Sequence, residues 1–109
     1  MNVYDKAYEL SNAIKNSEEY KSLKQAKEKV KSNPKVKEMY DELMDFQENF
    51  RNKQMQGEDI ADSEIEQFQK KFEIASMHSD MQNLFDAERR FSVMFDDVQK
   101  IIYDAVIKE

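Results

Sequence analysis

The sequence predicts an all-α fold, with four to five helices in an antiparallel bundle that forms a dimer. Its 109 residues include one Gly and one Pro, so the tight turns of an all-β fold cannot be supplied in number. Glu, Lys and Gln are frequent, and their straight side chains lose little rotamer freedom on a helix. Apolar residues also recur at three- and four-residue steps, as on one face of a helix.

The composition lies close to the boundary between folded and disordered chains. Charged residues make up 37% of the sequence and apolar residues 39%. Leu, Ile, Val and Phe together account for 24 of the 109 residues, slightly more than the roughly 20% below which disorder is expected. We therefore expect one folded domain over residues 1–109, with a modest core of its own.

The first predicted helix spans about residues 3–16. Four apolar side chains share one of its faces at helical spacing: Val3, Ala7, Leu10 and Ile14. Ser17 is a suitable N-cap for a second, weakly apolar helix. Glu18 and Glu19 would then lie in the first turn of that helix, where the helix dipole favours acidic side chains.

Asn33 and Pro34 mark the start of a third helix, because Asn caps well and Pro needs no N–H at the first helical position. Gly57 tolerates a left-handed backbone and would end this helix, which spans about residues 34–56 and about 35 Å. Ser63 and Glu66 match a capping box for a fourth helix. The loop between the third and fourth helices is short, so these two helices should be antiparallel neighbours.

The last predicted helix spans about residues 80–108, with Ser79 or Asp80 as its cap. Two seven-residue series run along it: Met81, Glu88, Phe95 and Ile102 form one, and Leu84, Phe91, Val98 and Ala105 form the other. A pattern sustained over nearly four heptads is typical of a helix-packing seam. Glu88, the polar member, either sets the register of a helical assembly or lies at the rim of the seam, paired with an Arg.

Two helices of about 35 and 42 Å are longer than a domain of this size can cover alone. Homodimerisation would cover their apolar faces. The residues that we assign to this helix-packing or dimer seam are Leu43, Phe46, Phe50, Leu84, Phe91, Phe95, Val98 and Ile102.

The chain offers little for catalysis, and we predict that it is not an enzyme and binds no metal or cofactor. It has no Cys, which excludes thiol catalysis and thiolate metal sites. The one histidine, His78, has no metal-binding spacing and is interpreted as a capping or surface residue. Acidic residues such as Asp41, Asp45 and Glu48 could bind a divalent cation weakly, but a solvated acidic face is the simpler interpretation.

Charge is distributed unevenly along the chain, whose net charge is −6. Residues 1–35 carry eight Lys and five acidic residues, and the acidic excess lies in residues 36–109. Lys24, Lys27 and Lys31 belong to a basic edge of the second helix that could meet an acidic protein or, alternatively, RNA. The first residues show no basic segment followed by an apolar stretch, and no long apolar run occurs in the sequence, so we expect a soluble cytoplasmic protein without a membrane partner.

Several segments resemble the YheA/YlbF/YmcA family of small bacterial helical proteins, and in particular its YheA branch. They include Val3-Tyr4-Asp5, Ser17-Glu18-Glu19-Tyr20, Ala87-Glu88-Arg89-Arg90 and, most specifically, the Lys53–Glu58 stretch KQMQGE. The resemblance implies a helical homodimer. It also implies a protein adaptor, since the YlbF and YmcA branch is associated with complexes that influence messenger-RNA processing and development. The iron–sulphur ligation proposed for that branch requires cysteines, which this chain lacks.

Overall fold

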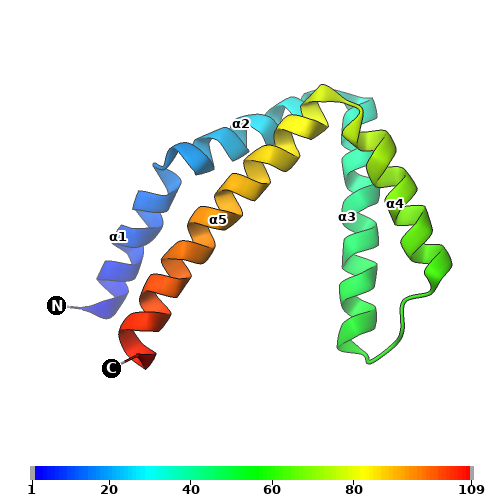
Figure 1. Cartoon of the computed structure of the whole chain (residues 1–109). Coiled ribbons are helices and arrows are strands. Elements are labelled where there is room, and N and C mark those ends of the chain that lie inside the picture. Colours follow the sequence, from blue (N-terminus) through cyan, green and yellow to red (C-terminus); the bar gives the residue numbers. More distant parts are fainter. Residues whose placement is uncertain (1, 109) are drawn as a thin grey trace. The chain divides into compact units, whose positions relative to one another are not determined.

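The computed structural model describes residues 2–108, and these residues form five helices and no strand (Figure 1). The helices are α1 (Val3–Lys15), α2 (Glu18–Ser32), α3 (Pro34–Met55), α4 (Asp62–Ser76) and α5 (Ser79–Ile107). The prediction of an all-α fold with two long helices is confirmed. The chain divides into a terminal unit (Met1–Lys27 with Leu84–Glu109) and a central unit (Glu28–Asn83). Both α2 and α5 contribute residues to each unit.

Polar side chains cap the first three helices. The backbone N–H of Tyr4 donates to Asn2 Oδ1 at 2.7 Å, and that of Tyr20 donates to Ser17 Oγ at 3.1 Å. The backbone N–H of Lys35 donates to Asn33 Oδ1 at 3.2 Å, directly before Pro34. The predicted caps Ser17 and Asn33 are therefore confirmed.

Helix α3 ends in a Schellman motif. The backbone N–H of Glu58 donates to the Lys53 carbonyl at 2.8 Å, and that of Gly57 donates to the Gln54 carbonyl at 3.2 Å. Gly57 has a φ of +73°, which an L side chain adopts only with strain. The glycine therefore ends α3 as predicted, with Gln56 as the C-cap.

The predicted capping box of α4 is wrong. Helix α4 begins at Asp62, so its N-cap is Ala61, which provides no side-chain hydrogen bond. Ser63 therefore lies inside the first turn, and the position three residues after the cap belongs to Glu64 instead of Glu66. The carboxylate of Glu64 accepts hydrogen bonds from Lys53 and Asn49 of α3, so it is bound to α3 and does not turn back to cap α4.

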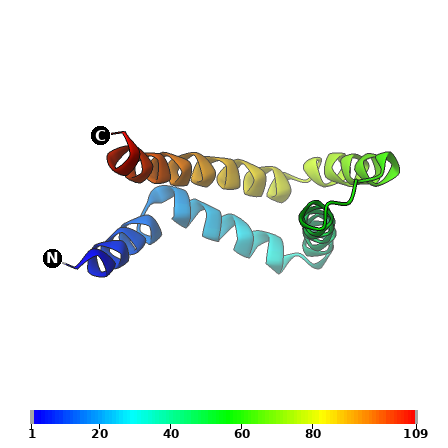
Figure 2. The same cartoon turned by 90° about the horizontal axis from the view of Figure 1, so that it is seen from below.

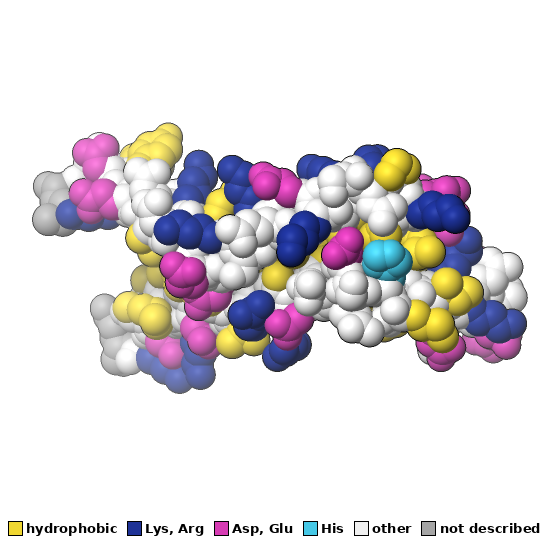
Figure 3. All heavy atoms as spheres, turned by 90° about the horizontal axis from the view of Figure 1, so that it is seen from above, with side chains coloured by type: hydrophobic (Ala, Val, Ile, Leu, Met, Phe, Trp, Pro, Cys, Tyr) yellow, Lys and Arg dark blue, Asp and Glu magenta, His cyan; other side chains and the backbone are white. Residues whose placement is uncertain are grey.

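The predicted cap of α5 is also wrong by one or two residues. Ser79 is already helical, and the preceding residue, His78, takes the capping position. The N–H of Asp80 donates to His78 Nδ1 at 3.4 Å, and Gln82 N–H donates to the His78 carbonyl at 3.0 Å. His78 is the one cyan side chain in Figure 3 and is partly exposed, which agrees with its interpretation as a capping residue.

In the central unit, α3 and α4 run antiparallel and pack together, as predicted (Figures 1 and 2). Phe46 and Phe50 of α3 contact Phe68 of α4, with ring centroids 6.2 and 5.6 Å apart. The buried apolar residues of this unit are Val30, Val36, Leu43, Ala75 and Met81. Burial is selective among its methionines: Met81 is 0% exposed, whereas Met55 and Met77 are each 80% exposed.

In the terminal unit, the start of α2 packs along α5. Leu23 and Ala26 of α2 are buried, as are Leu84 and Ala87 of α5. Beyond this core, the Tyr20 and Phe91 rings lie 6.1 Å apart. Helix α1 contributes no buried residue, so its apolar face is the least covered in this unit.

Candidate protein-interaction surface

Apolar side chains remain exposed where α1 and the C-terminal half of α5 lie in the terminal unit. Tyr8 of α1 is 71% exposed and Ile102 of α5 is 52% exposed. We call this exposed set the α1–α5 surface; it comprises Val3, Tyr4, Tyr8, Leu10, Phe95, Ile101, Ile102, Tyr103, Val106 and Ile107. Apolar side chains exposed in this number on two neighbouring helices exceed the isolated exposed residues of an ordinary surface, and they mark a candidate protein-interaction site.

The predicted seam of α5 is covered at one end and open at the other. Leu84 is fully buried, Phe91 and Val98 are partly buried, and Phe95 and Ile102 are exposed. Exposure of the seam increases toward the C-terminal end of α5. The buried side chains of α2 lie against the N-terminal half of α5, which includes Leu84. Farther along α5 the neighbouring helix is α1, which has no buried residue.

A groove of about 300 Å³ lies between α1 and α5. Its walls are mainly apolar and are formed by Ala7, Leu10, Ser11, Ile14, Lys15, Tyr20, Phe91 and Phe95. Phe91 and Phe95 stack with their centroids 5.8 Å apart. The predicted apolar face of α1 therefore points toward α5 without closing the space between the two helices.

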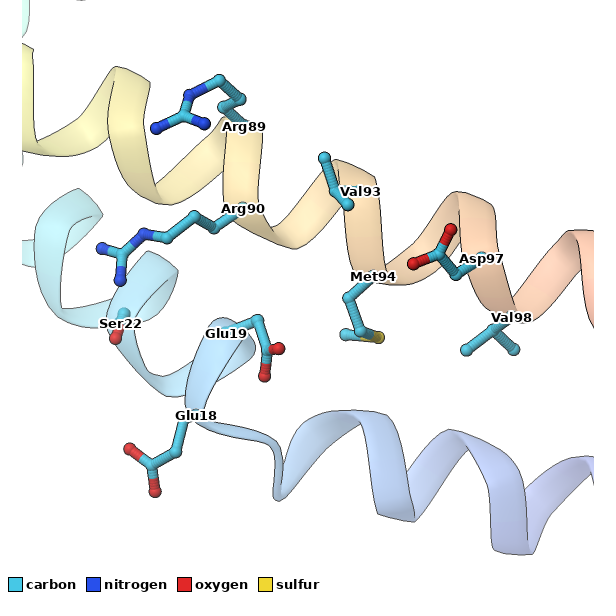
Figure 4. A pocket seen from close by; sticks show the side chains of 9 residues that line it. All are labelled: Glu18, Glu19, Ser22, Arg89, Arg90, Val93, Met94, Asp97 and Val98. Carbon is cyan, nitrogen blue, oxygen red and sulfur yellow. The ribbon is translucent and has the colours of Figure 1, made fainter.

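A second groove, of about 590 Å³, lies between the start of α2 and the middle of α5 (Figure 4). We call it the α2–α5 groove; it is lined by Glu18, Glu19, Ser22, Arg89, Arg90, Val93, Met94, Asp97 and Val98. Met94 points from α5 into the space between the helices, and Arg90 points toward α2. An apolar floor with charged rims is the usual design of a groove that accepts an amphipathic helix.

The charges of the α2–α5 groove are only partly neutralised within the chain. Both arginines share one carboxylate, since Arg89 pairs with Asp86 and Arg90 Nε lies 3.1 Å from Asp86 Oδ2. In contrast, Glu18, Glu19 and Asp97 have no ion-pair partner among residues 2–108. The acidic side chains are therefore available to basic groups of a partner.

Glu88 lies half-buried where α5 faces α2. Burial raises the pKa of its carboxyl above the usual 4.5, and the nearby ammonium group of Lys27 opposes part of that change. The predicted pairing of Glu88 with an Arg is wrong, because both neighbouring arginines are turned to Asp86. The charge that faces Glu88 is the lysine on α2.

The basic residues Lys24, Lys27 and Lys31 are all exposed on α2. On the face of the molecule in Figure 3, Lys and Arg side chains alternate with Asp and Glu side chains and do not merge into one basic area. A broad phosphate-binding surface would need such an area. A partner contact of the three lysines stays a prediction.

The three α3 residues of the predicted seam lie in the central unit. Leu43 is buried, and Phe46 and Phe50 pack against Phe68 of α4. Their role in the described chain is therefore packing between α3 and α4. Only the outer α5 residues of the predicted seam, such as Ile102, are still open to a partner.

The acidic residues on α3 do not converge on a common point. Asp41 pairs with Lys37 at 2.8 Å, and Asp45 and Glu48 are exposed. Within residues 2–108, no group of three His, Cys, Asp or Glu side chains is arranged to hold a metal ion. None of the described helices combines the length and apolarity needed to cross a membrane.

These features define a small all-helical protein with exposed apolar side chains on α1 and α5 and a groove lined by charged and apolar residues. A family model described as "Control of competence regulator ComK, YlbF/YmcA" matches residues 3–107. The chain therefore belongs to the YlbF/YmcA family, which confirms the resemblance seen in the sequence.

Relatives with similar sequences span nearly the same length. The chain is 41% identical over 102 residues to a UPF0342 protein of Bacillus licheniformis, covering 94% of this chain and 87% of that protein. It is 42% identical over 106 residues to a UPF0342 protein of Halothermothrix orenii, with the same coverage. The shared region thus extends over most of each protein.

Two solved structures share this fold. A protein of unknown function (DUF964) from Bacillus stearothermophilus has a TM-score of 0.88 and 31% identity, covering 95% of this chain and 91% of that chain. The yheA protein of Bacillus subtilis has a TM-score of 0.69 and 30% identity, covering 99% and 98%.

The sequence alone does not predict the α2–α5 groove. Glu18 and Glu19 are predicted only as first-turn acids of the second helix, and Arg89 and Arg90 enter only through the family resemblance. Because they lie about seventy residues apart, their position along one groove depends on the packing of α2 against α5, which helical periodicity alone does not reveal. The signal in the sequence that could have indicated the groove is the pair Arg89-Arg90 next to the apolar residues of the last helix.

Proposed function

We propose that this protein is a regulatory adaptor without catalytic activity: a homodimer that binds other cytoplasmic proteins through helical surfaces. The α1–α5 surface carries the proposal. Support for a regulatory role comes from the description of the family as one that controls a competence regulator. The lack of a converging set of metal-ligating side chains in residues 2–108 fits a binding protein.

The lack of buried residues in α1 supports the proposal that a partner covers this helix. This helix has 13 residues and none of them is buried. Helices of about 12 to 15 residues are marginal in water without tertiary packing. A partner that covers Tyr8 and Leu10 would stabilise α1 by removing apolar surface from water.

The terminal unit offers two separate places for partners. Its exposed apolar side chains on α1 and α5 could meet a second copy of the chain, and the α2–α5 groove could accept a further partner.

The α2–α5 groove is the proposed site for that further partner. An amphipathic helix would place its apolar stripe over Met94 and Val98 and its basic side chains beside Glu19 and Asp97. Charge complementarity of this kind favours a partner helix rich in Lys or Arg.

Sedimentation equilibrium tests the homodimer. We expect twice the chain mass at micromolar concentration. A stable monomer at that concentration would contradict the dimeric part of the proposal.

Affinity purification from native cytoplasm tests the adaptor, with proteins identified by mass spectrometry. Glu19→Lys should lose specific partners that the wild type retains, whereas the control Glu73→Lys on α4 should retain them. A triple charge reversal at Lys24, Lys27 and Lys31 tests the predicted contact on α2 in the same way. An equal set of captured proteins for all variants would remove both contacts from the proposal.

Nucleic-acid binding is the alternative function. It predicts a mobility shift of RNA that weakens steeply as salt increases, because phosphate contacts release counterions. We expect no such shift. Salt-sensitive RNA binding that the triple Lys reversal abolishes would favour the alternative over the adaptor.

A further inference from the structure

We propose that the α2–α5 groove selects a helix of another protein that carries an acidic and a basic side chain two turns apart, on either side of an apolar pair. The acidic side chain of that helix would meet Arg90, and the basic one would meet Asp97. This inference rests on the proposed function, because it specifies the chemistry of the further partner and the direction in which its helix lies.

The α5 wall of the groove is one helical face with a fixed order of charge. Five of the α5 side chains that line the groove are Arg90, Val93, Met94, Asp97 and Val98. They follow Arg90 by three, four, seven and eight residues, which is the spacing of one helical face. The positive and the negative side chain are thus about 10.5 Å apart along the helix axis. The apolar pair Val93 and Met94 lies between them.

The acidic side chains of α2 lie toward the same end of the groove as Asp97. In the terminal unit, α2 and α5 run antiparallel (Figures 1 and 2), and Tyr20 of α2 contacts Phe91 of α5. Glu19 comes before Tyr20 in α2, so it faces residues that come after Phe91 in α5. The Arg90 side chain points away from Asp97 (Figure 4). The groove is therefore positive at one end and negative at the other.

Neither end of the groove is neutralised within the described chain. Arg89 and Arg90 share the single carboxylate of Asp86, so this end keeps a positive charge. Glu19 and Asp97 have no ion-pair partner among residues 2–108. A helix with basic residues alone would place one of its cations beside the two arginines, and like charges in contact lower the affinity. The groove therefore favours a partner that carries both signs.

The order of the two charges in the partner would set its direction. A helix in which the acidic residue precedes the basic one can meet both ends of the groove only when it runs parallel to α5. A helix with the reverse order must run antiparallel to α5. The direction of a bound helix can be measured, so this part of the inference has a test of its own.

Designed peptide helices test the charge preference by fluorescence anisotropy with the full chain. The mixed probe carries Glu, then Leu three and four residues later, then Lys seven residues later; two matched probes carry Lys or Glu at both charged positions. At physiological salt, long-range attraction to the acidic chain is screened. The mixed probe should then bind roughly 5-fold more tightly than either matched probe. Equal binding of the mixed and all-Lys probes would overturn the inference.

Exchanging the charges of the groove provides a second test. Arg90→Glu and Asp97→Lys alone should each weaken binding of the mixed probe roughly 5-fold. The double variant keeps the net charge and should restore the affinity. Glu66→Lys with Lys70→Glu, at exposed positions of α4, is the matched control and should change nothing. Arg90 and Asp97 are exposed, so every variant should keep the helical circular dichroism of the wild type.

A spin label measures the direction of the bound helix. A nitroxide at the Lys end of the mixed probe should broaden amides near Asp97 in the ¹⁵N-labelled wild type. In the double variant the same label should broaden amides near Arg90, because the probe turns around to meet the exchanged charges. Broadening at the Arg90 end of the wild type would contradict the proposed charge order.

The outcomes separate this inference from the proposed function. If affinity purification yields partners that Glu19→Lys loses, but the mixed probe binds no better than the all-Lys probe, the adaptor stands and the charge order is wrong. If the wild type captures no specific protein and binds no probe, both proposals are wrong. A mixed probe that binds Arg90→Glu as tightly as the wild type does not use the groove as proposed, which overturns the inference alone.

Discussion

Lys53 and Glu64 join the last turn of α3 to the first turn of α4, with 2.5 Å between Nζ and Oε1. Asn49 donates to the other Glu64 oxygen at 3.3 Å. The two charged side chains are only 25% and 26% exposed, so they are less screened than the other ion pairs of the chain. Together these contacts set the register of α4 against α3.

Removing this pair should destabilise the protein measurably. We expect Glu64→Gln and Lys53→Met each to lower the free energy of unfolding by about 1 kcal/mol. A double-mutant cycle by urea unfolding would give their coupling. The exposed pair Lys6–Glu9 is the control and should show a coupling of less than about 0.5 kcal/mol. Equal couplings would mean that burial does not strengthen the Lys53–Glu64 contact.

Gly57 should be sensitive to substitution for a backbone reason alone. A Cβ added there would meet no atom within 4 Å, so steric contact is not the cause of the cost. The φ of +73° should make Gly57→Ala destabilising by about 1 kcal/mol, and Gly57→Asn by less. Thermal unfolding compared with Gln56→Ala checks this expectation. A neutral Gly57→Ala would show that the turn can change its conformation at no cost.

Glu88 should make stability depend on pH in a direction opposite to that of a salt-bridged acid. Its pKa is raised in the folded state, so the ionised carboxyl opposes folding. This penalty is absent well below pH 4.5, develops as the pH rises through the folded-state pKa, and is constant above it. Because the carboxyl is only half-buried, solvent screening should keep the penalty below about 1 kcal/mol.

The comparison of Glu88→Gln with wild type isolates this effect. The stability advantage of the variant should grow as the pH rises above 4.5, measured by urea unfolding at several pH values. Lys27→Met should enlarge the pH dependence, since Lys27 favours the ionised form. Glu66→Gln, on the exposed face of α4, is the control. An advantage that grows as the pH falls would contradict the assignment.

The two units should unfold together, as expected of a single domain. Leu43 in the central unit and Leu84 in the terminal unit are 2% and 0% exposed, and Leu→Ala at either should cost about 2–5 kcal/mol. Since α2 and α5 each contribute to both units, loss of one core should lower amide protection in both. Hydrogen exchange at fixed protein concentration tests this. Loss confined to the mutated unit would favour two independent domains.

Local sequence signals predicted the fold at positions where the type of a single residue determines the backbone conformation. Asn33 before Pro34 and Gly57 at a helix end require no knowledge of the tertiary structure. The start of α4 could not be predicted in this way. Ser63 and Glu66 match the capping pattern, but Glu64 is held by Lys53 across the α3–α4 contact, and that contact exists only in the folded chain.

The candidate surface was predicted in part. The seven-residue series on α5 identified Leu84 and Ile102 as members of one face, but periodicity cannot tell how far a neighbouring helix extends. Burial of Leu84 and exposure of Ile102 depend on where α2 lies along α5. For the same reason His78 was assigned to the surface or to a cap in general, while its specific role at the start of α5 required the backbone.

The difference in exposure among the methionines of the central unit makes their oxidation a measure of whether this unit is folded. Met55 and Met77 are 80% exposed, whereas Met81 is fully buried. Mild peroxide should convert the first two to sulfoxides while Met81 stays reduced for as long as the unit remains folded. The oxidation state of Met81, read in a tryptic digest, would therefore record folding inside living cells without any added label.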